Sequence, residues 1–227
     1  APLNHTVDPI IVGASVIAIK YADGILMCTD TLASFGSMAR YKNIPRMAAI
    51  GNSTLIGASG EYSDFQEIIR LLREKEQEDF IQHDNIKLSA AHYASYLSSI
   101  LYGKRNKGNP LYNSIAIAGI INDQQYLAYL DLYGTHVLAD YVTTGFAAHL
   151  CKPLLGNEWR PDLTESEAKQ LVESCMRTLW YRDARASNRI QFAKVTREGI
   201  TFEDPYVLQS EWGYDSYKTY SLNPLYA

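Results

Sequence analysis

The stretch Ser114–Ile121 constrains the fold most strongly, because its residues are apolar on both faces of an extended chain. A half-exposed strand alternates apolar and polar residues, whereas a continuous apolar run of this length indicates a strand covered on both sides. Asn122-Asp123 then turns the chain into a second predicted strand, Tyr126–Leu132, and a third follows Gly134. The sequence therefore predicts a sheet that lies between other layers.

Further strand patterns occur toward both ends of the chain, and short turns join them. Such turns connect neighbouring strands directly, so they predict antiparallel pairing and not the strand–helix alternation of a doubly wound sheet. These strands are two within Ser15–Asp30, two at Met47–Ile50 and Thr54–Ala58, and a final hairpin of Ile190–Val195 and Ile200–Phe202.

Two pairs of helices separate the groups of strands. Phe65–Leu72 places apolar residues at i, i+3, i+4 and i+7, the stripe of an amphipathic helix, and Ser63–Gln66 predicts a capping box at its start. A second helix has its apolar face within Tyr93–Leu101. Two more helical segments follow the central strands, and Thr164–Glu167 predicts a capping box at the start of the last one.

This order of elements predicts an α+β fold. Strands, two helices, strands, two helices and strands fit a four-layer αββα sandwich of two antiparallel sheets flanked by helix pairs. The length of 227 residues suits one domain with a sizeable core.

Composition excludes several classes of function. The net charge of −4 is too small for a nucleic-acid-binding surface, and the basic cluster Lys104–Lys107 is interpreted as the solvated end of a helix. No apolar run approaches the ~18 residues that span a bilayer, so no membrane is expected as a partner. Three cysteines without ligand spacing predict reduced, mostly buried thiols in an intracellular protein. No phosphate-binding, dinucleotide-binding or metalloprotease motif occurs and the five histidines are scattered, so neither a cofactor nor a metal is expected.

Residues 203–227 differ from the rest of the chain. Periodicity is lost, two prolines interrupt any regular element, and aromatic residues recur. Disordered tails are usually poor in aromatics, whereas subunit interfaces use Tyr and Trp heavily, so we favour an arm that docks on another subunit over a frayed tail. The arm's candidate contact residues are Tyr206, Trp212, Tyr214, Tyr217, Tyr220 and Tyr226.

Several short motifs, taken together, resemble the proteasome beta-type family, a branch of the N-terminal nucleophile hydrolases. They are Gly13-Ala14-Ser15, Asp23–Asp30, Gly36, Gly57-Ala58-Ser59-Gly60, Gly119, Thr144-Gly145 and Tyr181-Arg182-Asp183-Ala184. The resemblance implies the N-terminal nucleophile hydrolase fold for the predicted sandwich. It also implies three parts: an extension at 1–13, the beta-type domain at 14–202 and a C-terminal arm at 203–227.

In active members of the family, a Gly-Thr junction is cut autocatalytically and the new N-terminal Thr attacks a peptide carbonyl. Ala14 occupies the position of that nucleophile, and if Ala1 is the mature start, residues 1–13 leave no free amine there. Asp30 matches the active-site aspartate, but Leu32 stands where an arginine is expected. The family's lysine aligns with Arg46, which keeps a positive charge but has a differently shaped donor group.

Three more positions complete the comparison. Asp183 matches the aspartate near the end of the last long helix, and Thr144 falls near a serine that helps to orient the N-terminus. Ala186 stands where a second such serine is expected. With no nucleophile at residue 14, we interpret Asp30, Arg46 and Asp183 as a structural ion-pair cluster.

Within the family, the chain most resembles the non-catalytic class at the seventh position of the eukaryotic beta ring. The segments that carry this likeness are Asn109–Asn113, Thr144–His149, Pro153–Leu155 and Tyr181–Arg185. The resemblance implies a silent structural subunit of the 20S core, in cytoplasm and nucleus, with a part in ATP- and ubiquitin-dependent protein degradation. Its implied partners are beta subunits of its own and the opposite ring and the adjacent alpha ring.

Two other functions stay open at this point. An active threonine-type peptidase of the same fold needs a hydroxyl at residue 14. Ser15 could supply one only after cleavage behind Ala14 and a one-residue shift of the strand, which would turn its side chains to the other face. A stand-alone α/β domain that binds a small ligand would leave the aromatic tail unexplained.

Overall fold

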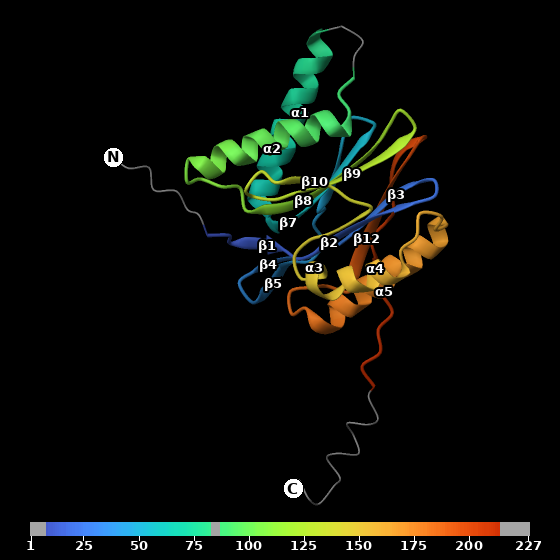
Figure 1. Cartoon of the computed structure of the whole chain (residues 1–227). Coiled ribbons are helices and arrows are strands. Elements are labelled where there is room, and N and C mark those ends of the chain that lie inside the picture. The colour runs from blue at the N-terminus through green and yellow to red at the C-terminus, as the bar shows by residue number, and fades with distance from the viewer. Residues whose placement is uncertain (1–7, 83–86, 214–227) are drawn as a thin grey trace, which may run out of the picture.

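The computed structural model describes residues 8–82 and 87–213. Two antiparallel sheets pack face to face, and helices cover both outer sides (Figure 1). Helices α1 (Tyr62–Gln82) and α2 (Ala90–Asn106) cover the first sheet, and α3 (Ala147–Leu150), α4 (Lys152–Glu158) and α5 (Glu165–Arg182) cover the second. The predicted four-layer α+β sandwich is confirmed.

The first sheet, here called sheet A, has the strand order β10-β9-β8-β7-β1-β4-β5, with β6 also paired to β7. Its strands are β1 (Ile11–Gly13), β4 (Ala33–Phe35), β5 (Met38–Tyr41), β6 (Met47–Ile50), β7 (Thr54–Glu61), β8 (Asn113–Ile121), β9 (Gln124–Leu130) and β10 (His136–Leu138). Strand β8 contains the apolar run, and it lies inside this sheet between helices on one face and the second sheet on the other.

The second sheet, sheet B, has the order β11-β2-β3-β12-β13, with β14 beside β12. Its strands are β2 (Val16–Tyr21), β3 (Gly24–Asp30), β11 (Tyr141–Thr143), β12 (Arg189–Thr196), β13 (Gly199–Phe202) and β14 (Tyr206–Val207). The chain moves between the sheets at Ala14-Ser15, from β1 to β2, and again at Thr31-Leu32, from β3 to β4.

Three buried apolar clusters hold the four layers together. One lies between α1, α2 and sheet A, one between the two sheets, and one between sheet B and α3–α5. In β2, Ile17 and Ile19 face the helices, whereas Val16 and Ala18 face the other sheet. This alternation explains why β2 is buried along almost its whole length.

The two predicted capping boxes have opposite outcomes. Thr164 caps α5 as predicted, because its side chain accepts a hydrogen bond from Glu167 N while the Glu167 carboxylate accepts one from Thr164 N. The capping box predicted for Ser63–Gln66 is wrong. Helix α1 already begins at Tyr62, and the Ser63 hydroxyl donates to the Glu61 carboxylate.

The two ends of the described chain are more ordered than the sequence indicated. Residues 11–13, predicted as part of an extension, form β1 inside sheet A. Residues Tyr206–Val207, predicted as part of an arm, pair with β12 in sheet B. No helix within the described ranges is long and apolar enough to cross a membrane.

Candidate functional site

Ala14 lies at the corner where the chain leaves sheet A for sheet B, and three of the predicted site residues gather around this corner. Asp30 ends β3, Arg46 immediately precedes β6, and Thr144 immediately follows β11. All three side chains are buried. Strand ends from both sheets therefore bring together residues as far apart in the sequence as Val16 and Thr144, which are 128 positions apart.

Arg46 is the centre of this arrangement. One end of its guanidinium forms an ion pair with the Asp30 carboxylate. Nη2 donates to the carbonyl oxygens of Ala14 at 2.6 Å and of Ala58 at 3.1 Å. The Asp30 carboxylate also accepts a hydrogen bond from Ser187 N at 2.8 Å. The planar guanidinium thus ties the corner at Ala14 to both sheets, which a lysine ammonium could not do with the same geometry.

The ion pair is fully removed from solvent, with the Arg46 and Asp30 side chains each 1% exposed. Burial raises the pKa of Asp30 above its ordinary value, and the charge of Arg46 and the Ser187 N–H offset this shift only in part. Taking such a pair out of water is costly, and the pair persists because hydrogen bonds satisfy the remaining groups. Its arrangement supports a structural role for both residues.

Thr144 and Asp183 make different contacts. The Thr144 hydroxyl accepts from Val16 N at 2.9 Å and so fixes β2 next to the corner. Asp183 ends α5, and its carboxylate accepts from Arg185 N at 2.9 Å. Among the described residues, Asp183 forms no ion pair with Arg46, so the predicted three-member cluster is reduced to the Asp30–Arg46 pair.

Gly13 lies directly against the Arg46 side chain. A β-carbon at residue 13 would come within 2.3 Å of Arg46 Nε, much closer than nonbonded atoms approach. The guanidinium therefore fills the space beside the 13–14 peptide bond, and glycine is the residue that leaves room for it.

Glu61 holds the strand that precedes the corner, a role that the sequence analysis did not predict. Its carboxylate accepts hydrogen bonds from the backbone N–H groups of Ile10 and Ile11, the latter at 2.9 Å. Strand β1 itself pairs with β7 through Gly13 and Gly60 and with β4 on its other side. An acidic residue between a strand and a helix carries no signal for a partner 50 positions earlier in the chain.

Ser15, the other hydroxyl considered as a nucleophile, is held within the fold. Its side chain is 2% exposed, and its hydroxyl accepts a hydrogen bond from Ala147 N at 3.0 Å. Leu32 and Ala186, which stand where polar residues were expected, are both buried, and Ala186 belongs to the apolar cluster between sheet B and α3–α5. The Ser15 hydroxyl, which follows Ala14 in the chain, is therefore engaged within the fold.

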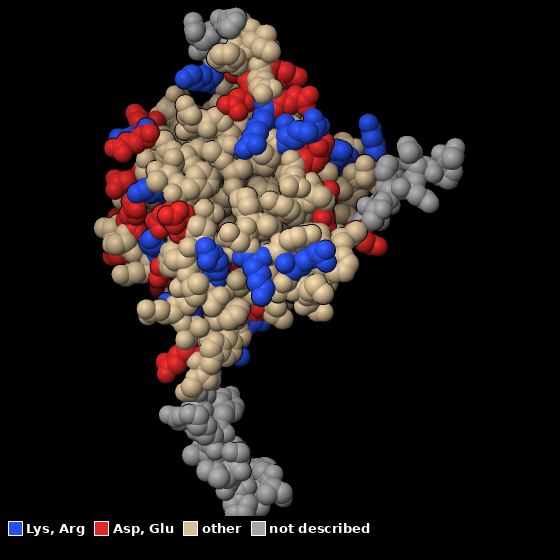
Figure 2. All heavy atoms as spheres, turned by 180° about the vertical axis from the view of Figure 1, so that it is seen from behind, with Lys and Arg blue, Asp and Glu red and all other residues tan. Residues whose placement is uncertain are grey.

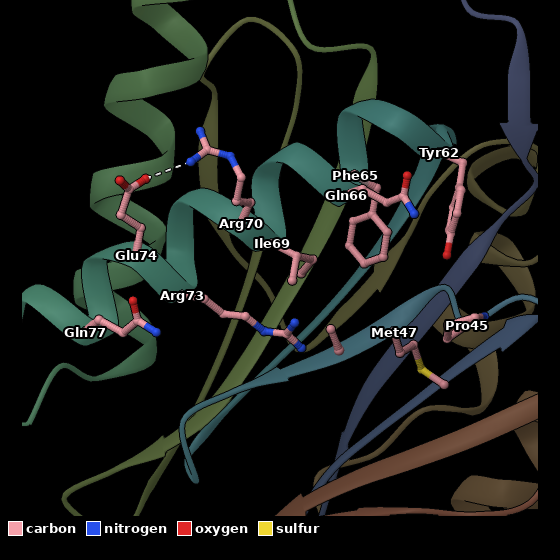
Figure 3. A pocket seen from close by; sticks show the side chains of 11 residues that line it. Pro45, Met47, Tyr62, Phe65, Gln66, Ile69, Arg70, Arg73, Glu74 and Gln77 are labelled. Atoms are coloured by element: carbon pink, nitrogen blue, oxygen red, sulfur yellow. Dashed lines mark hydrogen bonds and ion pairs between the residues drawn. The ribbon is translucent and has the colours of Figure 1, made fainter.

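A surface groove of about 740 Å³ lies near this corner, between α1 and the start of β6. Figure 3 shows Phe65 and Ile69 of α1 pointing toward β6, with Arg73 reaching across the groove and Arg70 bonded to Glu74 on the outer side of the helix. Pro45 and Met47, the neighbours of Arg46, form one end. None of the predicted site residues lines the groove, so it adds no reacting group to the corner.

The aromatic residues predicted for the C-terminal arm are described only in part. Tyr206 stacks on Phe192, with ring centroids 6.3 Å apart, and its hydroxyl donates to Glu173. Trp212 packs its ring against Trp180 and Tyr181 at the end of α5. Tyr214, Tyr217, Tyr220 and Tyr226 lie outside the described residues.

Comparison with known proteins gives a consistent result. A family profile described as "Proteasome subunit" matches residues 11–195. The chain is 44% identical to proteasome subunit beta type-4 of Arabidopsis thaliana, over 94% of this chain and 87% of that protein. It is 39% identical to the probable proteasome subunit beta type-7 of Schizosaccharomyces pombe, over 94% of this chain and 84% of that protein. With proteasome subunit beta type-7 of Saccharomyces cerevisiae it shares 35% identity, over 89% of this chain and 80% of that protein.

Proposed function

The chain belongs to the proteasome beta-type subunit family, and on this basis we infer that it is a non-catalytic, structural subunit of the 20S core. The observation that carries the proposal is the methyl group at Ala14, because a nucleophile of this family must offer a hydroxyl at that position. The hydroxyl of the next residue, Ser15, is buried and accepts a hydrogen bond from Ala147 N. Residue 14 therefore offers no attacking oxygen for peptide hydrolysis.

A second obstacle supports the same conclusion. An N-terminal nucleophile needs a free amine at its own residue, yet residues 11–13 continue upstream of Ala14 as a strand paired on both sides. Glu61 and Arg46 hold the two ends of this segment, at Ile11 N and at Ala14 O. Residues 10–13, part of the proposed extension, are thus held against the domain beside the corner.

The surface supports a role in assembly. A broad uncharged area lies in the middle of the face shown in Figure 2, between interspersed acidic and basic side chains. Large apolar side chains are exposed on two sheet edges, for example Met38 on β5, 57% exposed, and Leu138 on β10, 62% exposed. Exposed apolar surface of this kind is typical of contact sites between proteins.

The division of the chain into segments and its location in the cell are part of the same proposal. They are an extension at 1–13, a beta-type domain at 14–202, an arm at 203–227 that reaches the opposite beta ring, and residence in cytoplasm and nucleus. In this role the subunit shapes the chamber in which other subunits degrade proteins, and it helps to join the two halves of the particle.

A covalent probe tests the catalytic part of the proposal. Assembled particles containing a tagged copy of this chain are treated with a peptide electrophile that reacts with N-terminal threonine, and the mass of each subunit is measured. We expect adducts on active subunits of the same particle, which act as the internal control, and none on this chain. An adduct on this chain would overturn the assignment, and a Ser15→Ala variant would show whether Ser15 is the residue that reacts.

A further inference from the structure

Residues 203–211 run along α5 and contact it once in every helical turn. The four contacting residues of the helix are spaced by four positions, so they lie on one face. The contacts are Lys169 Nζ with Glu203 Oε2 at 2.6 Å, Glu173 with the Tyr206 hydroxyl, Arg177 Nε with Gln209 O at 3.0 Å, and the Tyr181 hydroxyl with Glu211 N at 2.7 Å. The segment therefore follows α5 in the same direction, from its first turns to its last.

The other side of the segment is held by sheet B. Tyr206 pairs with Ile190 in β12, and Leu208 N donates to Asn188 O at 2.7 Å. Leu208 is 3% exposed and belongs to the cluster between sheet B and α5. A segment bonded to a helix on one side and to a strand on the other has a fixed path up to residue 211.

Trp212 ends this path in an unusual environment. Its ring meets Trp180 edge-on, with centroids 6.0 Å apart and planes at 86°, and meets Tyr181 at 5.1 Å and 80°. The Trp212 side chain nevertheless remains 58% exposed. A large aromatic residue held by ring contacts at the last turn of a helix fixes the direction of the chain there without being part of the core.

We propose that the face of α5 formed by Lys169, Glu173, Arg177 and Tyr181, here called the α5 track, sets the direction in which the C-terminal residues leave the domain. Trp212 is the positioning residue at the end of the track. Figure 1 shows the described chain leaving beyond the layer of α3–α5, on the side opposite to α1 and α2. The inference rests on the proposed function, because it takes the residues after 213 to dock on a subunit of the opposite ring.

The physical benefit of the track is pre-organisation. A docking segment that starts from a freely moving point loses more conformational entropy on binding than one whose first residues are already ordered. Fixing residues 203–212 also raises the effective concentration of the following segment near its binding surface. The track therefore favours the joining of two rings.

The first experiment compares wild type, Trp212→Ala and Trp212→Phe as the only copy of this subunit in cells, with native gels that separate half-particles from double rings. Because Trp212→Ala removes two ring contacts, we expect about a tenfold lower ratio of double rings to half-particles. Trp212→Phe keeps an aromatic edge and should recover most of this loss. Tyr133→Ala, at a similarly exposed tyrosine (57%) in the turn before β10, is the matched control.

The outcomes separate the two proposals. Normal entry of Trp212→Ala into half-particles, with fewer double rings, supports the α5 track. Equal double-ring yields for Trp212→Ala and wild type overturn the track and leave the structural function of the subunit intact. If wild type enters neither half-particles nor double rings, the proposed function fails and the track fails with it.

A cross-linking experiment tests whether the segment stays on the track after assembly. Cysteines are introduced by Arg177→Cys and Gln209→Cys, and purified double rings are treated with a short bismaleimide. We expect an intrachain cross-linked peptide by mass spectrometry, absent from either single variant. Cross-linking in half-particles but not in double rings would show that the segment leaves α5 on assembly, which contradicts the proposal.

Discussion

Removing the Arg46 guanidinium should destabilise the domain far more than removing an ordinary surface arginine. Arg46→Met keeps a long apolar stem but deletes the ion pair with Asp30 and the hydrogen bonds to Ala14 O and Ala58 O. Both side chains of the pair are 1% exposed, so the Asp30 charge would remain buried without its partner. Breaking a buried pair in this way costs about 3–5 kcal/mol of unfolding free energy.

The loss should depend on pH, with a predictable sign. Burial already raises the pKa of Asp30 in the folded chain, and Arg46 is the largest influence that lowers it. Without Arg46 the pKa of Asp30 in the folded chain rises further. In the unfolded chain the pKa of Asp30 has its ordinary value of about 3.9. Between these two pKa values, the folded variant therefore keeps a proton on Asp30 that the unfolded chain has released. As pH falls through the raised pKa, the carboxyl becomes neutral and the cost of the missing arginine shrinks. The variant should therefore regain stability relative to wild type on acidification from pH 7.

Urea unfolding of the purified chain at several pH values measures both effects. Arg160→Met is the matched control, because Arg160 is also paired with carboxylates but its side chain is 52% exposed. Exposed pairs contribute at most about 1 kcal/mol, and the control should show only that. A loss below about 1 kcal/mol for Arg46→Met at pH 7, or a loss that stays constant between pH 7 and pH 5, would refute the reasoning.

Three further predictions concern other parts of the chain. Ala14→Thr alone should leave the peptide bond between residues 13 and 14 intact, because Arg46 cannot act as a base and β1 remains paired with β7. Mass spectrometry of the intact chain tests this, and a mass that lacks residues 1–13 would contradict it. Thr164→Ala should lower the unfolding free energy by about 1 kcal/mol through loss of the α5 cap, whereas Thr164→Ser should not, and urea midpoints test the difference. A thiol reagent should label Cys28, Cys151 and Cys175 negligibly in the native chain and completely after unfolding. The reason is that each cysteine is 0% exposed and that burial raises the pKa of Cys28. Rapid labelling of the native chain would contradict this, because it would show that the cores open.

The layered fold could be predicted from the sequence because its signals are local. The apolar run of β8 and the apolar stripes of the helices each need only a window of about ten residues to be recognised. Asn122 and Asp123 also turn the chain as predicted, with φ angles of 49° and 65°. Both lie in the left-handed region that two-residue hairpin turns require, and Asn and Asp tolerate it.

The contacts at the corner could not be predicted in the same way. Strand β1 has three residues and pairs with partners that lie about 20 and 50 positions later, so no local period reveals it. Ser63 matched a capping pattern, but Glu61 immediately before the helix accepts the Ser63 hydroxyl. The position of Arg46 followed from the family resemblance, whereas its bond to Ala14 O needed the three-dimensional arrangement.

The position of β1 between β7 and β4 also determines how sheet A opens locally. In the described chain, β1 is the strand that links β4 and β5 to β7. If β1 detaches, the β4–β5 hairpin loses its ladder to the rest of the sheet, while β7, β8 and β9 stay paired with one another. Amide hydrogens of β4 should therefore exchange with solvent by local opening, at rates set by the release of residues 10–13, whereas those of β8 should exchange only on global unfolding. The first strand of the chain thus determines the opening free energy of a hairpin that follows it by twenty residues.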